Sequence, residues 1–304
     1  MSYQELTTLP GVAQLFSQLK TFLLANSWVL DFEDNSIPSL MMHKASAKFY
    51  FAYSSSGSGT ITMTNSGSGG SVITTNGWAG AFSSAWFFSD ATKAYFHVVV
   101  AAADGVYNHL SFGYVDNLGM TNTARYATGQ LWNYTSYINY IINTSEHRPC
   151  FMCQAAYLIP SGELDTAYAP AGEIATTAHI ETFNMNRMDG TPSQGFPYVT
   201  SYYYGILDYV MDLNNVADTA GIHLHSIPMQ VYLNNNNHNL GIAPDVRFCL
   251  INLLQDAQEI TNSGDTWKVF PMVKRGNRTA LLFGAAPVNE LNSVNLGFAY
   301  KKIL

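Results

Sequence analysis

Two pairs of histidines are the residues whose types and spacing most directly suggest chemistry. His223 and His225 stand two residues apart in an alternating pattern, and His97 and His109 lie on the two arms of a predicted β-hairpin. Residues two apart in a strand share a face, and two imidazoles on one face can bind a metal. No acidic residue or third histidine lies close to His223 and His225 in sequence. We therefore interpret all four as structural histidines that form hydrogen bonds, and we predict no metal site.

Cys150 and Cys153 form half of a possible zinc site. A structural zinc would need two further ligands, and only the fold could bring Cys249 and His147 to this pair. A redox role would require the pair to open a helix in a βαβ unit, whereas the surrounding residues are typical of strand and loop. We predict reduced, buried thiols, and the odd number of three cysteines does not make a disulfide framework.

The motifs of common enzyme classes are absent from the chain. It contains no G-x-S-x-G sequence, no P-loop and no G-x-G-x-x-G sequence opening a helix. The acidic pairs Glu163 with Asp165 and Asp256 with Glu259 could act as in a glycosidase, but nothing around them favours that role. We predict that the protein is not an enzyme, with no catalytic, cofactor-binding or metal-binding residues and no cofactor. Four tryptophans that could stack on sugars are instead expected inside sheets: Trp78, Trp86, Trp132 and Trp267.

Charge and composition exclude further classes of function. The net charge is -7, and the only basic cluster, Lys274, Arg275 and Arg278, is typical of a solvated turn, so we expect no direct contact with nucleic acid. We find no signal peptide and no apolar run long enough to span a membrane, so we expect synthesis in a cytoplasm. Charged residues make up 12% of the chain, against a usual ~25%. Such a surface favours a protein packed in an assembly over the alternative, a secreted β protein with an Asn/Thr-rich face.

One amphipathic helix is clear near the N-terminus. Pro10 suits the first turn of a helix, and the helix is expected to end near Asn26. It is predicted to face the core or to form an arm laid across a neighbouring subunit. Six apolar residues follow the helical spacing: Val12, Leu15, Phe16, Leu19, Phe22 and Leu23.

The rest of the chain has the pattern of β-strands. A three-residue loop at residues 103–105, with Gly105 left-handed, pairs Phe96 with Phe112 and Val98 with Leu110 on one apolar face. We predict that this face packs into the core and that the opposite face, with the two histidines, meets solvent or another subunit. Further strands are predicted at residues 49–53, 60–64, 201–210, 222–233, 245–255, 265–273 and 293–304, with a long loop at 183–197.

These elements predict a mainly β protein of antiparallel, sandwich-like sheets with one N-terminal helix and long loops. We divide the chain into an N-terminal helix or arm (1–30), a β domain (31–182) and a second β region (183–304) packed on the first as one unit.

Two segments resemble structural proteins of tailed bacteriophage virions. One is "AWFFSDATKAYFHVVVAAADGVYNHLSFGYVD", and the other is "PDVRFCLINLLQDAQEITNSGDTWKVFPMVKRG", followed later by "LGFAYKK". With the N-terminal helix they cover about a third of the chain, and the shared pattern is one of aromatic and β-branched residues. Nothing in it is catalytic, so the resemblance implies no functional residue.

The resemblance implies a virion component of the tail, neck, collar or baseplate. Such a protein is made in the bacterial host's cytoplasm and assembles there without disulfides. Its partners would be further copies of itself, as a ring-like homo-oligomer, and other virion structural proteins. The alternative is a secreted carbohydrate-binding or glycan-hydrolysing β protein. A receptor-binding fibre tip is a third possibility, but it would begin with a thin repetitive shaft rather than a helix.

Overall fold

The structure is a computed structural model of the 304-residue chain. It describes residues 2–45, 47–55, 60–64, 72–76, 78, 80–102, 105–114, 116, 124–131, 150–158, 174–175, 226–233, 238–251, 254–262, 264–271 and 296–303. Within these residues the protein is mainly β, with three antiparallel sheets and a single helix, which confirms the predicted fold class.

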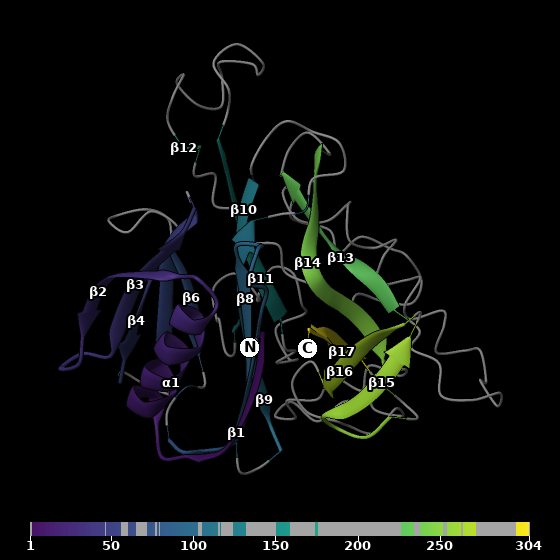
Figure 1. Ribbon diagram of the computed structural model, residues 1–304, viewed down its shortest axis with the longest axis horizontal. Helices are drawn as coiled ribbons and strands as arrows, with labels where there is room; N and C mark the ends of the chain where they lie inside the picture. The colour runs from purple at the N-terminus through teal and green to yellow at the C-terminus, as the bar shows by residue number, and fades with distance from the viewer. Residues whose placement is uncertain are drawn as a thin grey trace, which may run out of the picture.

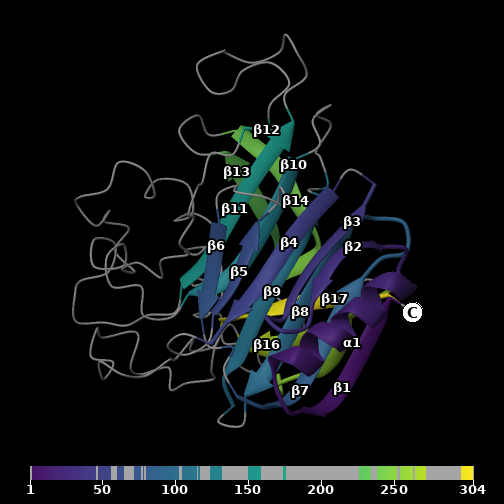
Figure 2. The same ribbon diagram turned by 90° about the vertical axis from the view of Figure 1, so that its left-hand side faces the viewer.

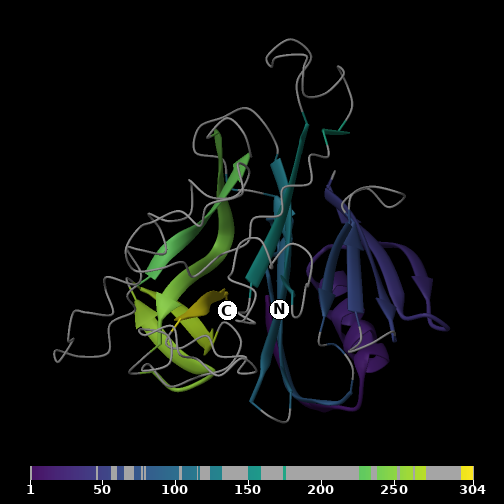
Figure 3. The same ribbon diagram turned by 180° about the vertical axis from the view of Figure 1, so that it is seen from behind.

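The three sheets form layers, with one sheet between the other two (Figure 1). The central sheet has the order β1 (Tyr3–Leu9), β7 (Phe82–Ser89), β8 (Tyr95–Ala102), β9 (Tyr107–Tyr114), β10 (Ala124–Leu131), β11 (Cys150–Leu158) and β12 (Ile174–Ala175). The N-terminal sheet runs in chain order through β2 (Val29–Asp34), β3 (Ser39–Lys44), β4 (Ala47–Ser54), β5 (Thr60–Thr64) and β6 (Val72–Asn76). The C-terminal sheet has the order β13 (Ser226–Leu233), β14 (His238–Leu250), β17 (Leu296–Lys302), β16 (Asp265–Pro271) and β15 (Gln258–Asn262). The view from behind shows the same layers in reverse order (Figure 3).

The predicted helix is α1 (Val12–Ala25), and all six predicted apolar residues are buried. It ends in a Schellman motif, in which the backbone N–H of Trp28 donates to the carbonyl of Leu23 at 3.1 Å and that of Ser27 donates to Leu24 at 3.2 Å. Ser27 has a φ of 65°, the left-handed conformation that this motif requires. The motif turns the chain so that Trp28 enters the core beside Phe49, where the two ring centroids are 5.3 Å apart.

The hairpin of β8 and β9 has the predicted register. Phe96 lies opposite Phe112 and Val98 opposite Leu110. The N–H of Ala102 donates to the carbonyl of Val106 at 2.8 Å, which closes the predicted three-residue loop. Gly105 has a φ of 79°, as a loop of this length requires.

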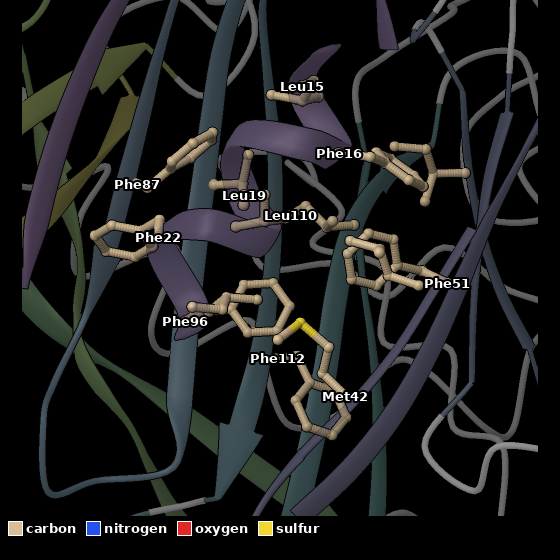
Figure 4. Close-up of a cluster of buried hydrophobic side chains, with 14 of the residues drawn as sticks. Leu15, Phe16, Leu19, Phe22, Met42, Phe51, Phe87, Phe96, Leu110 and Phe112 are labelled. Carbon is tan, nitrogen blue, oxygen red and sulfur yellow. The ribbon is translucent and has the colours of Figure 1, made fainter. Parts of the chain in front are cut away.

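The apolar face of this hairpin packs into the core, as predicted. It meets α1 and the inner face of the N-terminal sheet, and Figure 4 shows how the side chains interleave. Phe96 and Phe112 lie within 5 Å of Phe49, measured between ring centroids. The residues labelled in the figure are Leu15, Phe16, Leu19, Phe22, Met42, Phe51, Phe87, Phe96, Leu110 and Phe112.

The prediction for the opposite face is wrong. His97 and His109 are both 0% exposed, and their face of the hairpin packs against the C-terminal sheet of the same chain. Alternation in sequence distinguishes two faces of a strand, but it cannot show that both are covered. The polar side chains suggested a solvated face, whereas hydrogen bonds to the C-terminal sheet satisfy them.

Several other predictions are settled within the described residues. Strands are confirmed at β4, β5, β14, β16 and β17, and β4 pairs with β5 as an antiparallel hairpin. Sequence analysis missed β1, which pairs with β7 at an edge of the central sheet. The predicted strand at 201–210 and the predicted loop at 183–197 lie outside the described residues, as do His223 and His225. The proposed boundary at 182/183 lies there too, so the division into regions stays a prediction.

Candidate functional site

The two hairpin histidines belong to a hydrogen-bonded seam between the central and C-terminal sheets. Nδ1 of His97 is 2.8 Å from Oγ of Ser111, and its Nε2 is 2.8 Å from the carbonyl oxygen of Pro244. Nδ1 of His109 is 2.8 Å from the hydroxyl of Tyr300, and its Nε2 is 2.9 Å from the carbonyl oxygen of Pro271. Both nitrogens of each ring are therefore occupied by partners in the same chain.

These partners determine the tautomers. A carbonyl oxygen only accepts, so Nε2–H of each ring must donate to its proline carbonyl. Each Nδ1 then accepts a hydrogen bond from a hydroxyl, Ser111 for His97 and Tyr300 for His109. Both rings are neutral in this arrangement, and burial lowers the pKa of His97 to about 3 and that of His109 to about 4. The seam joins two sheets and offers no free nitrogen for chemistry.

The other residues considered for metal binding do not come together in the described part of the chain. There, no three His, Cys, Asp or Glu side chains gather in a way that could hold a metal ion. Cys249 is buried and reduced, and burial raises its pKa. The side chains of Cys150 and Cys153 lie outside the described set, as do His147, Glu163 and Asp165.

The remaining acidic pair and the tryptophans are placed by the structure. Asp256 lies in the turn before β15, and Glu259 pairs with Lys302 at 2.8 Å between carboxylate and ammonium. Trp78, Trp86 and Trp267 are at most 5% exposed, in agreement with the expected place inside sheets, while Trp132 is not described. The described tryptophans therefore offer no exposed stacking face.

The surface feature that stands out is a concentration of exposed apolar side chains, which we call the β2 corner: Leu24, Val29, Phe32 and Ile37. Their exposed fractions are 45%, 48%, 45% and 59%, and they are the only large hydrophobic side chains exposed among the residues whose burial the structure describes. All four lie within fourteen consecutive residues, at the end of α1, on β2 and in the turn after it. Exposed apolar side chains that share one face of a surface strand, as Val29 and Phe32 do, indicate a contact site.

β2 is also a free edge of the N-terminal sheet. It pairs only with β3, so its other side carries no neighbouring strand among the described residues. Figure 2 looks onto this sheet and shows β2 as its outermost strand on the side of α1. An edge strand presents unpaired backbone N–H and C=O groups that can pair with a strand of another chain.

A β-bulge places Val29 and Phe32 on the same, outer face of β2, while Leu30 faces the core. Val29 lies opposite His43 and Phe32 opposite Met41, with Asp31 as the additional residue between them. His43 and Met41 are two apart on β3, so Val29 and Phe32 share one face although they are three residues apart. That face is the outer one, because Leu40 and Met42 on the other face of β3 are buried in the core.

The acidic residues of β2 already have partners. Asp31 contacts His43 at 2.9 Å and Lys48 at 3.2 Å, measured between carboxylate oxygen and nitrogen. Glu33 contacts Lys20 at 2.6 Å, and Asp34 accepts hydrogen bonds from the backbone and hydroxyl of Ser36. The charges of Asp31 and Glu33 are thus compensated by lysines within the chain, and Asp34 is engaged in a turn, which leaves apolar side chains and edge backbone groups as the main means of contact. Sequence analysis missed this site because exposure depends on which layers cover β2.

No family model matches the chain, and no curated protein matches it. No helix among the described residues is long and apolar enough to cross a membrane.

Proposed function

We propose that the protein is a structural component of a tailed-phage virion, in the tail, neck, collar or baseplate, and that it acts by symmetric self-assembly. In this proposal it is not an enzyme. It is made in the host cytoplasm and resides in the virion, in contact with further copies of itself and with neighbouring virion proteins. The observation that carries the proposal is the β2 corner, four exposed apolar side chains on and beside an edge strand whose Asp31 and Glu33 are paired with lysines of the same chain.

The composition supports the same proposal. Only 12% of residues are charged, and a surface with few charges resists association weakly. The segments that resemble virion proteins form β7, β8, β9, β14, β15, β16 and β17, the strands around the histidine seam. In this proposal those strands give a rigid body, and the N-terminal sheet presents the surface for contact.

The alternative of a carbohydrate-binding or glycan-hydrolysing protein has less support. Such a site would need exposed aromatic rings and a carboxylate pair near one another. The four described tryptophans are at most 5% exposed, and the acidic residues of β2 form ion pairs or turn hydrogen bonds.

The native mass of the protein, measured by light scattering after gel filtration, tests the proposal. We expect a discrete multimer for the natural sequence, and we expect Phe32→Lys to shift it to smaller species because a lysine charge would be buried at the contact. The free energy of unfolding should change by less than about 0.5 kcal/mol, since Phe32 is exposed in the single chain.

Thr261→Lys is the matched control. Thr261 is exposed on β15, the free edge of the C-terminal sheet, so the change adds the same charge to a different edge. It should leave the mass unchanged. A natural protein that stays monomeric at every concentration would contradict self-assembly, and equal effects of the two substitutions would contradict the role of the β2 corner.

A further inference from the structure

β1 is attached to the body of the protein in a way that would allow it to leave and be replaced by the same strand of another copy. It lies at the edge of the central sheet, and β7 is its only partner among the described strands. Of its seven residues only Leu9 is buried, and the others are half-buried or exposed. An edge strand with little buried surface is the kind of element that protomers exchange.

Thr8, which connects residues 3–7 of β1 to the rest of the protein, has a strained backbone conformation. We call Thr8 the joint and the rest of the protein, from Leu9 onwards, the body. Thr8 has a φ of 57°, in the left-handed region, and it is the only β-branched residue among the described non-glycine residues with positive φ. A β-branched side chain in this region is a true outlier, because its Cβ substituents collide with the backbone. Thr8 lies between Thr7 and Leu9, which pair with Ser84 and Phe82 of β7. Opposite it is Ser83, the residue bulged against β8.

Leu9, the residue after Thr8, is held in place by the hydrophobic core. It is 2% exposed and belongs to the core that α1 and the N-terminal sheet share with the central sheet. Pro10 and Gly11 follow it and lead into α1. A change of φ at Thr8 alone would swing residues 3–7 away while Leu9 and the helix stayed in place.

The contacts that β1 makes are all with the body and would be available to an incoming copy of β1. Glu5 pairs with Lys268 at 2.8 Å between carboxylate and ammonium. The Tyr3 ring lies 5.3 Å from that of Phe88 and 4.8 Å from the Lys302 ammonium. The Lys268 side chain is only 7% exposed, and Glu5 of β1 is the closer of its two carboxylate partners, since Glu259 lies 3.8 Å away.

We propose that β1 exchanges between copies of the chain, so that β7 of each protomer pairs with β1 of its partner. Closed and exchanged forms make the same strand contacts, and they differ at the joint. The closed form holds Thr8 in the left-handed region, whereas a chain that extends through Thr8 to a partner releases this strain. A dimer releases the backbone strain of Thr8 in both of its chains, and this gain offsets part of the entropy lost on association. The inference rests on the proposed function only in requiring that copies associate.

A disulfide between directly opposed residues tests the exchange. Thr7 and Ser84 are register partners at the exposed edge, and such Cα atoms lie about 4.5–5.5 Å apart, within reach of a disulfide. The variant Thr7→Cys/Ser84→Cys is oxidised while folded and run on a denaturing gel without reductant. Exchange predicts covalently joined chains. A bond formed only within single chains would overturn the proposal.

Two controls accompany this variant. Thr261 and Thr266 are register partners within the β15–β16 hairpin, so Thr261→Cys/Thr266→Cys should join only residues of one chain. The natural sequence, oxidised in parallel, reports any linkage through its own three cysteines.

Relief of the strain provides a second test that needs no cysteines. Glycine adopts a φ of 57° without steric cost. Thr8→Gly therefore removes the backbone strain of the closed form, and with it the energetic advantage of the exchanged form. It should raise the dissociation constant of the exchanged dimer at least tenfold, since each dimer relieves two joints. An unchanged dissociation constant would overturn the proposal even if the cysteine variant failed to fold.

The failure of this inference is distinguishable from failure of the proposed function. A multimer whose Thr7–Ser84 bonds lie within single chains would refute strand exchange and leave self-assembly standing. Phe32→Lys should reduce the mass of the multimer but preserve the bonds between chains, because the β2 corner and the β1–β7 edge belong to different sheets. A monomer at every concentration would refute both.

Discussion

The buried histidines make the stability of the protein sensitive to mild acid. Both rings are neutral in the folded protein, with the pKa of His97 at about 3 and that of His109 at about 4, whereas an unfolded chain protonates histidine near pH 6.5. Between these values the unfolded state binds more protons, so the free energy of unfolding must decrease as the pH falls below about 6.5. The limiting slope is about 1.4 kcal/mol per pH unit for each histidine.

Urea unfolding at several pH values between 7.5 and 5 measures this dependence. Carboxylates with a lowered pKa, such as Glu5 and Asp90, change protonation mainly below pH 5. They therefore contribute little to the pH dependence of stability between pH 7.5 and 5. His109→Gln keeps one donor and one acceptor but cannot titrate here, so its slope should be smaller than that of the natural sequence. A stability that stays flat from pH 7 to pH 5 would contradict the neutral, buried state of both rings.

The histidine seam also shows which residue-level features sequence could not predict. The placement of His97 and His109 on the same face follows from the hairpin register, and sequence analysis predicted it correctly. Their partners, Pro244, Pro271 and Tyr300, are more than 140 positions away, and no local pattern connects them. Lys44 is a second case, because its buried ammonium donates to the carbonyls of Asn26, Asp90 and Ala91.

At the scale of elements, α1 was predictable because its apolar spacing and its end near Asn26 both agree with the structure. Pro10, which was predicted in the first turn, lies just before the N-cap residue Gly11. The edge strands β1 and β2 were not predictable, because sequence alone does not reveal a partner strand. Both strands contain an irregularity. In β1 it is the positive φ of Thr8, and in β2 it is the bulge at Asp31. Such local exceptions to the strand pattern lower the signal that alternation gives.

The end of α1 allows a test of the Schellman motif by substitution. Ser27 is exposed and left-handed, and glycine is the residue that this position favours. Ser27→Gly should raise the free energy of unfolding by about 0.5–1 kcal/mol, because relief of the Cβ collision outweighs the added freedom of the unfolded chain. Chemical denaturation at neutral pH measures the change.

Ser27→Ala is the control for this substitution. It removes the hydroxyl but keeps the Cβ atom, so it should bring no gain in stability. If alanine stabilised the protein as much as glycine, the gain would come from helix propensity and not from the left-handed turn.

At the scale of the whole molecule, the central sheet belongs to two cores at once. Alternate residues of β7, β8 and β9 face α1 and the N-terminal sheet on one side and the C-terminal sheet on the other. Neither outer sheet can lose its support without exposing a face of these strands. The predicted packing of the chain as one unit therefore implies a single cooperative unfolding transition.

Adjacent valines of β8 provide a matched test of this cooperativity. Val98 faces the core with α1 and Val99 faces the C-terminal sheet, and both are at most 1% exposed. Val98→Ala and Val99→Ala should each lower the free energy of unfolding by about 1–3 kcal/mol, because each leaves a cavity of the same size.

In a single cooperative unit, each substitution should accelerate hydrogen exchange in both outer sheets, measured by mass spectrometry on peptides from β3–β4 and from β16. If Val98→Ala affected only the N-terminal sheet and Val99→Ala only the C-terminal sheet, the layers would unfold independently. Their shared strands would then hold two separate domains together, and the C-terminal sheet could detach while the β2 corner kept its shape.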